Sequence, residues 1–137
     1  FSSALTIPGP NVLAERGLII DIEPVSGDSV YNDHRDCPDL FQYAGPLWVR
    51  NWRPGDAYWR RGSSGVQKIK QMFQDHRIPL WERRTWPVIV TEDPGVDNPD
   101  GVAVEGLIVW SRRFGVASQF APGGNGPVLR VSEPGRT

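Results

Sequence analysis

Glycine and proline punctuate the whole chain, and their number limits what it can fold into. The 137 residues include 15 Gly and 13 Pro. Gly adopts backbone conformations that other residues avoid, and Pro lacks the N–H that helices and central strands use. Such punctuation favours many short strands joined by turns over long helices. The length is that of one domain with a single core.

Composition is typical of a soluble globular protein. Hydrophobic residues make up 39% and charged residues 23% of the chain, both ordinary values for that class. No apolar run approaches the ~20 residues of a membrane span, and no signal-peptide pattern opens the chain. Cys37 is the only cysteine, so an internal disulfide is excluded and a cytoplasmic location is expected. Because residue 1 is Phe and not Met, we expect a piece of a longer protein; a natural start codon immediately upstream would instead indicate an orphan domain.

Short strands are expected over residues 4–25. Leu18, Ile20 and Ile22 alternate with a mixed set of residues, which predicts a strand with one apolar face. Residues 32–39 are polar and are expected to form a loop.

His34 and Cys37 in this loop have the spacing of metal ligands. Structural zinc sites need four ligands, and the chain has one further histidine, His76, and no further cysteine. We therefore expect loop residues here and no metal site.

Charge is segregated along the chain. Residues 1–49 have a net charge of −5, residues 50–84 of +6 and residues 85–137 of −2. A polyanion-binding surface needs such local positive charge, because the attraction of phosphates depends on nearby cations. The alternative is that the arginines are scattered over the fold and only solvate it.

A strand followed by a tight turn opens the basic segment. Residues 47–52 alternate between two faces, as in a strand. Pro54 and Gly55 then predict a structural turn in which Asp56 accepts backbone N–H groups. A catalytic role for Asp56 is less favoured, because no acid or base lies near it in the sequence.

The main helix is predicted over about residues 64–77. Ser64 and Gln67 fit a capping box at its start, and Pro79 ends it. An apolar stripe at helical spacing, expected in the core, consists of Val66, Ile69, Met72 and Phe73.

The remaining sequence predicts further short strands. A single helical turn is expected within residues 80–86. Strands are expected at 87–91, 102–104, 106–110 and 112–117, with an acidic loop at 92–101. From Pro122 we expect a loosely held tail, in which residues 128–131 are a candidate edge strand. Together these elements predict an α+β fold that is mostly β.

The six tryptophans divide into two groups. We expect core positions for Trp52, Trp81, Trp86 and Trp110, and leave Trp48 and Trp59 open between core and surface. Tyr58 or Trp59, if exposed beside the neighbouring arginines, is a candidate to stack on a base or ribose.

The central run resembles the C-terminal domain of bacterial tRNA(Ile)-lysidine synthetase. Its segments follow that family's order: a V-R-x-x-x-P-G-D turn at 49–56, a Gly-containing loop at 62–65, a K-x-K helix at 68–70, an Ile-Pro step at 78–79, and a P-V-I-V strand at 87–90. Residues 106–110 and 115–116 resemble its closing strands. The resemblance covers about residues 46–120, and the order and spacing of the motifs are more specific than any one of them.

The resemblance implies a barrel-like antiparallel β module with one main helix, similar also to part of phenylalanyl-tRNA synthetase. It divides the chain into an N-terminal β segment of the same domain (1–45), a tRNA-binding core (46–120) and a Gly/Pro-rich tail (121–137).

The family's full-length enzyme uses ATP to adenylate the wobble cytidine of an isoleucine tRNA and then joins lysine to it. That chemistry lies in an N-terminal domain with an S-G-G-x-D-S signature, which this chain lacks, as it lacks a P-loop. We therefore expect no catalytic residue, metal or cofactor in this chain; ATP, Mg²⁺ and lysine would belong to the catalytic domain. The implied partners are the tRNA acceptor stem and that catalytic domain, with no DNA and no membrane.

The basic residues are the candidate RNA contacts. Double-stranded RNA is bound through phosphates and 2′-hydroxyls, which requires cations at several points. The candidates are Arg50, Arg53, Arg60, Arg61, Lys68, Lys70, Arg77, Arg83 and Arg84.

Two alternatives belong to other classes of protein. In the first, the tryptophans and arginines form a hot-spot patch for a protein partner or for the enzyme's own catalytic domain. In the second, Asp56, Asp75 and His76 form the site of a small hydrolase, although nothing in the sequence places them in one cleft.

Overall fold

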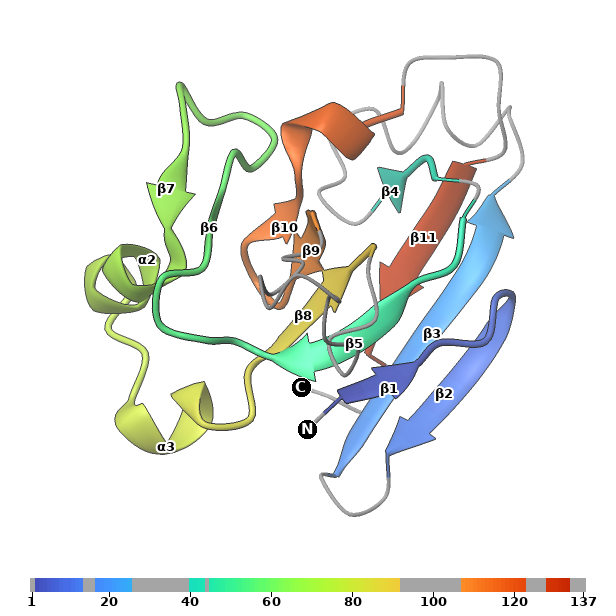
Figure 1. Cartoon of the computed structure of the whole chain (residues 1–137), viewed down its shortest axis with the longest axis horizontal. Helices are drawn as coiled ribbons and strands as arrows, with labels where there is room; N and C mark the ends of the chain where they lie inside the picture. The colour runs from blue at the N-terminus through green and yellow to red at the C-terminus, as the bar shows by residue number, and fades with distance from the viewer. Residues whose placement is uncertain are drawn as a thin grey trace, which may run out of the picture.

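The computed structural model of the chain describes residues 2–13, 17–25, 40–43, 45–91, 107–122 and 128–133. Within these ranges the strands form three antiparallel sheets around one hydrophobic core (Figure 1). The prediction of a mostly β fold with one main helix is confirmed. The described strands form open sheets, so the expected barrel does not close.

The first sheet has five strands in the order β1-β5-β8-β9-β10. Its strands are β1 (Ser2–Ala4), β5 (Trp48–Asn51), β8 (Pro87–Val90), β9 (Ile108–Ser111) and β10 (Gly115–Val116). Every residue of β8 and β9 is buried. The strand predicted at 112–117 is shorter, because residues 112–114 form the turn out of β9. A short 3-10 helix, η2 (Ser118–Phe120), follows β10.

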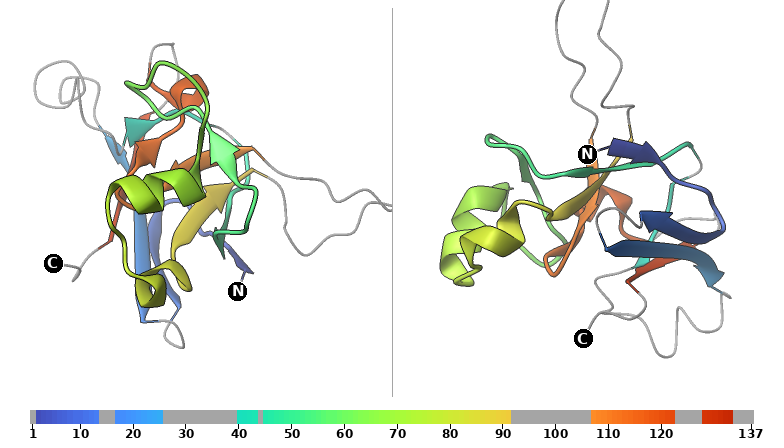
Figure 2. Two further views of the ribbon diagram at one scale, coloured as in Figure 1. Left: turned by 90° about the vertical axis from the view of Figure 1, so that its left-hand side faces the viewer. Right: turned by 90° about the horizontal axis from the view of Figure 1, so that it is seen from below.

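The second sheet has four strands in the order β2-β3-β11-β4 and lies in a separate layer (Figure 2). Its strands are β2 (Gly9–Leu13), β3 (Leu18–Val25), β4 (Leu40–Phe41) and β11 (Val128–Ser132). The predicted apolar face of β3 is confirmed, since Leu18, Ile20 and Ile22 are buried.

Strand β11 corrects the expectation of a loosely held tail after Pro122. It pairs with β3 along its whole length and with β4 on its other side, so it is an internal strand. Leu129 and Val131 are buried in the core. Two inward apolar side chains are a weak signal in sequence, and only the pairing with β3 and β4 makes the segment central.

A two-stranded hairpin precedes the main helix. The hairpin and the helix consist of β6 (Ala57–Tyr58), β7 (Gln67–Lys68) and α2 (Ile69–Asp75). Helix α2 is thus shorter than predicted. The stripe of Ile69, Met72 and Phe73 is buried as expected, whereas Val66 lies before the helix and is 69% exposed.

The predicted capping box is wrong. The N-cap of α2 is Lys68, in an extended conformation and without a side-chain cap hydrogen bond. The backbone N–H of Ile69 donates instead to the carbonyl of Asp56 at 2.9 Å. A backbone carbonyl just before β6 therefore accepts one of the first-turn N–H groups that a capping side chain would otherwise bind.

Helix α2 ends in a Schellman motif. The N–H of Ile78 donates to the carbonyl of Phe73 at 2.9 Å, and the N–H of Arg77 to that of Gln74 at 3.2 Å. Arg77 occupies the left-handed position, with φ of 53°, where Gly is usual. Pro79 then precedes the predicted single turn, α3 (Leu80–Arg83).

Phe73 joins α2 to the five-stranded sheet through aromatic contacts. Its ring lies edge-on to Trp52 at 4.9 Å and to Trp86 at 5.1 Å, and tilted against Phe114 at 6.0 Å. The indole N–H of Trp86 donates to the hydroxyl of Ser111 at 2.9 Å, so this buried polar group is satisfied.

Three of the four core predictions for tryptophan agree with the structure. Trp86 and Trp110 are buried, and Trp52 is partly buried against the core. Trp81 is 72% exposed, so its core prediction is wrong; it lies on α3, a single turn that buries none of its residues. Of the two left open, Trp48 packs partly against the core and Trp59 is 49% exposed.

A buried ion pair ties β5 to the turn that follows it. The guanidinium of Arg50 donates to both carboxylate oxygens of Asp56, at 2.8 and 2.9 Å, and to the carbonyl of Asn51 at 3.1 Å. The two paired side chains are only 6% and 12% exposed. Asp56 also accepts the backbone N–H of Arg53 at 2.7 Å, so its predicted role in the turn is confirmed.

Several predictions concern residues outside the described ranges. These are the polar loop with His34 and Cys37, the acidic loop 92–101 and the strand at 102–104. Among the residues that are described, no group of three or more His, Cys, Asp or Glu could hold a metal ion. No helix formed by these residues is long and apolar enough to cross a membrane.

Removing the charge of Asp56 should strongly destabilise the fold. Asp56→Asn keeps the shape of the side chain but leaves the buried Arg50 guanidinium without a counter-charge. We expect the free energy of unfolding to fall by about 3 kcal/mol or more, the usual cost of breaking a buried pair from one side. Denaturant unfolding measures it. The control, Asp75→Asn, alters an exposed carboxylate and should stay within about 0.5 kcal/mol of the parent; equal losses in the two variants would contradict a structural role for the pair.

Replacing Arg77 by glycine should stabilise the protein. Glycine adopts the left-handed conformation without the steric cost that Arg77 bears, so we expect a gain of about 0.5–1 kcal/mol. Thermal and denaturant unfolding check this gain. The matched control, Arg77→Ala, loses the same charge but keeps a Cβ and should not stabilise. A gain of equal size in both variants would show that charge, and not backbone conformation, is responsible.

Candidate nucleic-acid interface

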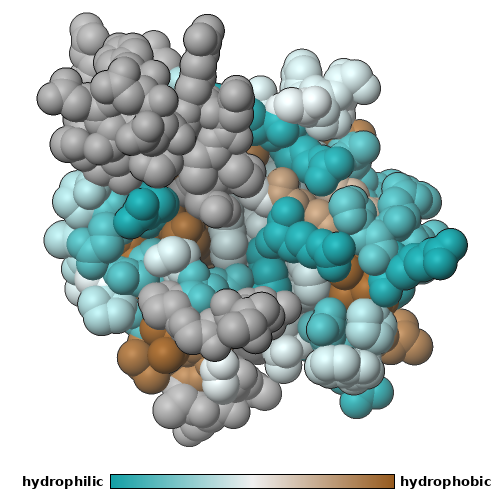
Figure 3. Space-filling view, turned by 180° about the vertical axis from the view of Figure 1, so that it is seen from behind, coloured by the Kyte–Doolittle hydropathy of each residue, from teal (hydrophilic) through white to brown (hydrophobic). Residues whose placement is uncertain are grey.

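The segments that carry the predicted RNA contacts gather at one end of the molecule. They run from the turn after β5 through the hairpin to α2 and α3, on the left of Figure 1, away from the four-stranded sheet. Figure 2 shows α2 and α3 on the same side of the molecule. Seen from behind, hydrophilic side chains cover much of this end (Figure 3).

The candidate cations differ in exposure. The exposed candidates are Arg53, Lys68, Lys70, Arg77 and Arg84. The half-buried candidates are Arg60, Arg61 and Arg83, and the buried one is Arg50. We call the exposed and half-buried members together the cationic surface.

Arg50 does not belong to that surface. It is 5% exposed, and its guanidinium is engaged by Asp56 and by a backbone carbonyl. Its prediction as an RNA contact is therefore corrected to a structural role. The sequence signal for this role is that both partners lie in the V-R-x-x-x-P-G-D stretch, which the tight turn folds back on itself.

Within the described residues, the exposed members of the cationic surface have no carboxylate partner. Across the described ranges, the ion pairs closer than 4 Å are Arg50–Asp56 and Arg112–Glu133. Neither involves an exposed member of the cationic surface. An ammonium or guanidinium group without a nearby carboxylate keeps its full attraction for an external anion.

Lys68 and Lys70 flank the start of α2. Lys68 ends β7 and Lys70 lies in the first helical turn, and both are exposed. Ile69 between them is fully buried. The buried Ile69 thus anchors the backbone while its two neighbours carry charge into solvent, as the sequence predicted.

Arg83 has a mixed role. Its Nε donates to the carbonyl of Ile78 at 2.7 Å, and its guanidinium carbon lies 5.2 Å from the centroid of the Phe73 ring. The side chain thus holds α3 against α2. Within the described residues, the two terminal nitrogens have no protein hydrogen bond, so these donors are available to a ligand.

The two candidate stacking residues differ in exposure. Tyr58 is 5% exposed, and its hydroxyl donates to the carbonyl of Gly115 at 2.8 Å, so its stacking prediction is wrong. Burial raises the pKa of the Tyr58 hydroxyl well above its usual range. Trp59 remains accessible, and its indole N–H donates to the carbonyl of Ser63 at 2.7 Å.

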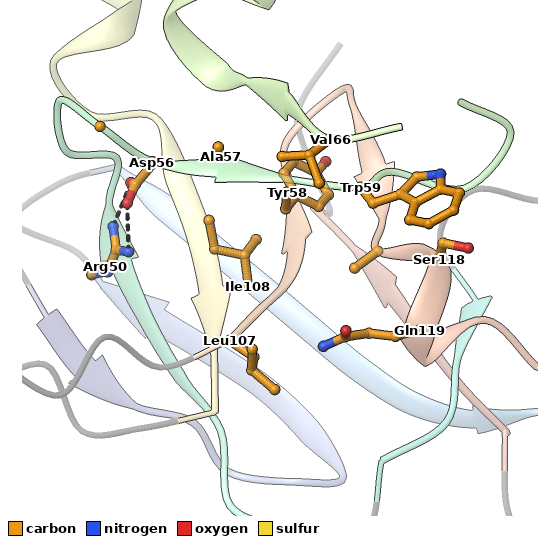
Figure 4. Close-up of a pocket in the computed structure, with 12 residues that line it drawn as sticks. Arg50, Asp56, Ala57, Tyr58, Trp59, Val66, Leu107, Ile108, Ser118 and Gln119 are labelled. Atoms are coloured by element: carbon orange, nitrogen blue, oxygen red, sulfur yellow. Dashed lines mark hydrogen bonds and ion pairs between the residues drawn. The ribbon is translucent and has the colours of Figure 1, made fainter. Parts of the chain in front are cut away.

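A pocket of about 660 Å³ opens beside Trp59. Its walls include Val66 from the hairpin, Leu107 just before β9 and Gln119 of η2. The Arg50–Asp56 pair lies at the far end of the pocket from Trp59 (Figure 4). Neither Leu107 nor Gln119 stands out in the sequence as a site residue. These positions come together only through the pairing of β9 with β10, so no local pattern marks them.

The hydrolase alternative is not supported by the geometry. The carbonyl of Asp56 receives the first N–H of α2, while Asp75 and His76 lie at the other end of that helix. Seven helical residues place these ends roughly 10 Å apart. The Asp56 carboxylate is also occupied by Arg50. These three side chains do not form one reaction site.

Comparisons with known proteins agree with this arrangement. A family model described as the TilS substrate C-terminal domain matches residues 47–123. The chain is 45% identical over 106 residues to a tRNA(Ile)-lysidine synthase of Solibacter usitatus, covering 77% of this chain and 21% of that protein. It is 29% identical over 113 residues to that of Symbiobacterium thermophilum, covering 80% of this chain and 22% of that protein. The chain thus spans about a fifth of the length of these relatives.

A solved structure shares the fold. A crystal structure of a TilS C-terminal domain superposes with a TM-score of 0.66 at 24% identity, covering 99% of this chain and 100% of the other. The fold similarity therefore extends beyond residues 47–123 to the strands before and after them. Because the family model matches more than half of the 137 residues, this chain belongs to the TilS substrate C-terminal domain family, as its motifs suggested.

Proposed function

We propose that this chain is the tRNA-gripping domain of an ATP-dependent tRNA(Ile)-lysidine synthase. In this proposal it holds the acceptor stem while a separate catalytic domain joins lysine to the wobble cytidine. ATP, Mg²⁺ and lysine would bind to that catalytic domain, and the whole enzyme would work in the cytoplasm. Family membership and the curated relatives named above support the proposal.

The observation that carries the proposal is the cationic surface itself. Exposed cations from the turn after β5, from β7 and from both helices lie at one end of the molecule. Among the described residues, no ion pair involves Arg53, Lys68, Lys70, Arg77 or Arg84. Double-stranded RNA presents phosphates and 2′-hydroxyls across a wide, shallow groove and few readable base edges. Exposed cations distributed over several elements suit such a ligand.

A second candidate function rests on α3. Leu80 and Trp81 are each 72% exposed, although large apolar side chains are usually covered. Exposed tryptophan beside arginine is typical of hot spots in protein interfaces. In this alternative, α3 docks against the enzyme's own catalytic domain. Such docking would tolerate salt better than RNA binding does, and it is compatible with RNA binding elsewhere on the surface.

Binding of tRNA should weaken steeply with salt. If about four members of the cationic surface contact phosphates, a plot of log Kd against log salt concentration should rise with a slope of roughly 3–4. Each neutralised phosphate releases counterions, and this release is what makes the affinity depend on salt. Between 50 and 200 mM salt the affinity of the full-length protein should then fall about 100-fold. Titration of tRNA(Ile) at several salt concentrations measures this slope. A slope near zero would contradict phosphate binding and favour the protein-docking alternative.

Removing Lys68 and Lys70 together should lower that slope. The double variant Lys68→Ala, Lys70→Ala should weaken tRNA binding at low salt about 10-fold and reduce the slope by roughly 2, since two contacts are lost. Its stability should change little, because both side chains are exposed.

The control for the lysine pair is Arg130→Ala. Arg130 is an exposed cation on β11, in the sheet away from the cationic surface. This variant should keep the parent's affinity and slope. If it weakens binding as much as the lysine pair does, the interface is misplaced.

A further inference from the structure

We infer that the pocket beside Trp59 takes one unpaired nucleobase of the RNA that the cationic surface holds. This inference rests on the proposed function and adds to it a second kind of contact. The cationic surface binds the backbone, whereas the pocket would bind a base. Its support comes from the ring, the walls and the polar group that line the pocket.

Trp59 is a rigid and uncovered aromatic surface. Its indole N–H is held by the carbonyl of Ser63 at 2.7 Å, and its own carbonyl accepts the N–H of Ser118 at 2.6 Å. Ring and backbone are thus fixed from two sides, yet 49% of the residue is exposed. A pre-positioned ring loses little conformational entropy on binding, and a nucleobase stacks on such a ring whatever its sequence identity.

The pocket walls add exposed apolar surface around that ring. Val66 is 69% and Leu107 57% exposed, whereas Tyr58 and Ile108 at the pocket are buried. These buried side chains belong to the core, so the pocket has a firm floor. Two large exposed aliphatic side chains on one cavity favour a ligand with flat apolar faces, because covering them removes apolar surface from water.

Gln119 supplies the polar edge. Its side chain extends across the pocket towards Leu107 (Figure 4), and within the described part of the chain it makes no hydrogen bond. An amide offers both a donor and an acceptor, and the edge of a nucleobase presents both as well. A peptide side chain in the same pocket would use the apolar walls but would not need this amide.

Size and charge agree with a nucleotide. A volume of about 660 Å³ lies in the range of small-ligand sites. Arg60 follows Trp59 directly, and its backbone pairs with Ala117 at the pocket. A base held against Trp59 would therefore have its phosphate near the cationic surface. We accordingly favour RNA over a peptide segment of the catalytic domain as the occupant.

The test compares three RNAs on the full-length protein. One is a blunt stem, the second carries a single-stranded 3′ extension of four nucleotides, and the third carries the same extension without its bases. The abasic extension keeps the phosphates, so it separates stacking from charge. We expect the extension with bases to bind at least about 5-fold more tightly than the abasic one, which corresponds to one base stacked on one aromatic ring.

Variants of the pocket residues test whether the tighter binding of the extension with bases comes from this pocket. Trp59→Ala should abolish the preference for bases, Trp59→Phe should keep part of it, and Gln119→Ala should reduce it about 2-fold or more. Trp81→Ala removes another exposed tryptophan that does not line the pocket, and it should keep the full preference. All four variants should keep the salt-dependent binding of the blunt stem, which also shows that they are folded.

Each outcome decides between the proposals. Equal binding of the two extensions, or a preference that survives Trp59→Ala, overturns the base pocket while the proposed function stands on the blunt stem. If no stem binds, the proposed function fails and the pocket inference fails with it. If Trp59→Ala leaves all three RNAs unaffected but weakens association with the catalytic domain, the pocket holds a protein segment and not a base.

Discussion

The Arg50–Asp56 ion pair joins the rigid part of the molecule to the part that faces a ligand. Arg50 lies on β5, which pairs with β1 and β8 in the five-stranded sheet, and Asp56 lies in the segment that carries the exposed cations. The same aspartate fixes the turn through the N–H of Arg53 and accepts the first N–H of α2 with its carbonyl. One residue thus connects sheet, turn and helix, so the position of the cationic surface depends on a carboxylate that never contacts the ligand itself.

The core beneath α2 explains how a short helix can hold charges in place. An isolated helix of seven residues is not stable in water. Here Phe73 packs against Trp52, Trp86 and Phe114. This packing provides the stability that helix propensity alone does not give to so short a helix. The exposed side chains of α2 are consequently free to be polar or charged. Apolar anchoring on one face and charge on the other are two consequences of the same short amphipathic segment.

The sequence predicted elements with strong local signals and missed those that depend on distant partners. Alternation identified β3, and Pro54 with Gly55 identified the turn. The helix start was misplaced because pairing of β7 with β6 overrode the local capping signal of Ser64. Charge segregation indicated the cationic surface, but it could not separate the buried Arg50 from its exposed neighbours, since burial follows from tertiary packing. The pocket was missed for the same reason: β9 and η2 supply its walls from more than forty residues away from Trp59.

The cationic surface and the base pocket would contribute differently to RNA binding: the first to affinity, the second to recognition of a particular nucleotide. Phosphate contacts give affinity and orientation but carry no information about which nucleotide lies where. Every RNA stem offers the same charged backbone, so cations alone would hold many RNAs about equally well. An unpaired base next to a stem is a feature of RNA shape and not of charge, and only a site with a fixed ring and a polar edge can detect it. In this chain both kinds of site share the hairpin: Arg60 and Lys68 belong to the first, and Trp59 and Val66 to the second. The hairpin would therefore combine non-specific binding of the RNA backbone with recognition of an unpaired base at one position.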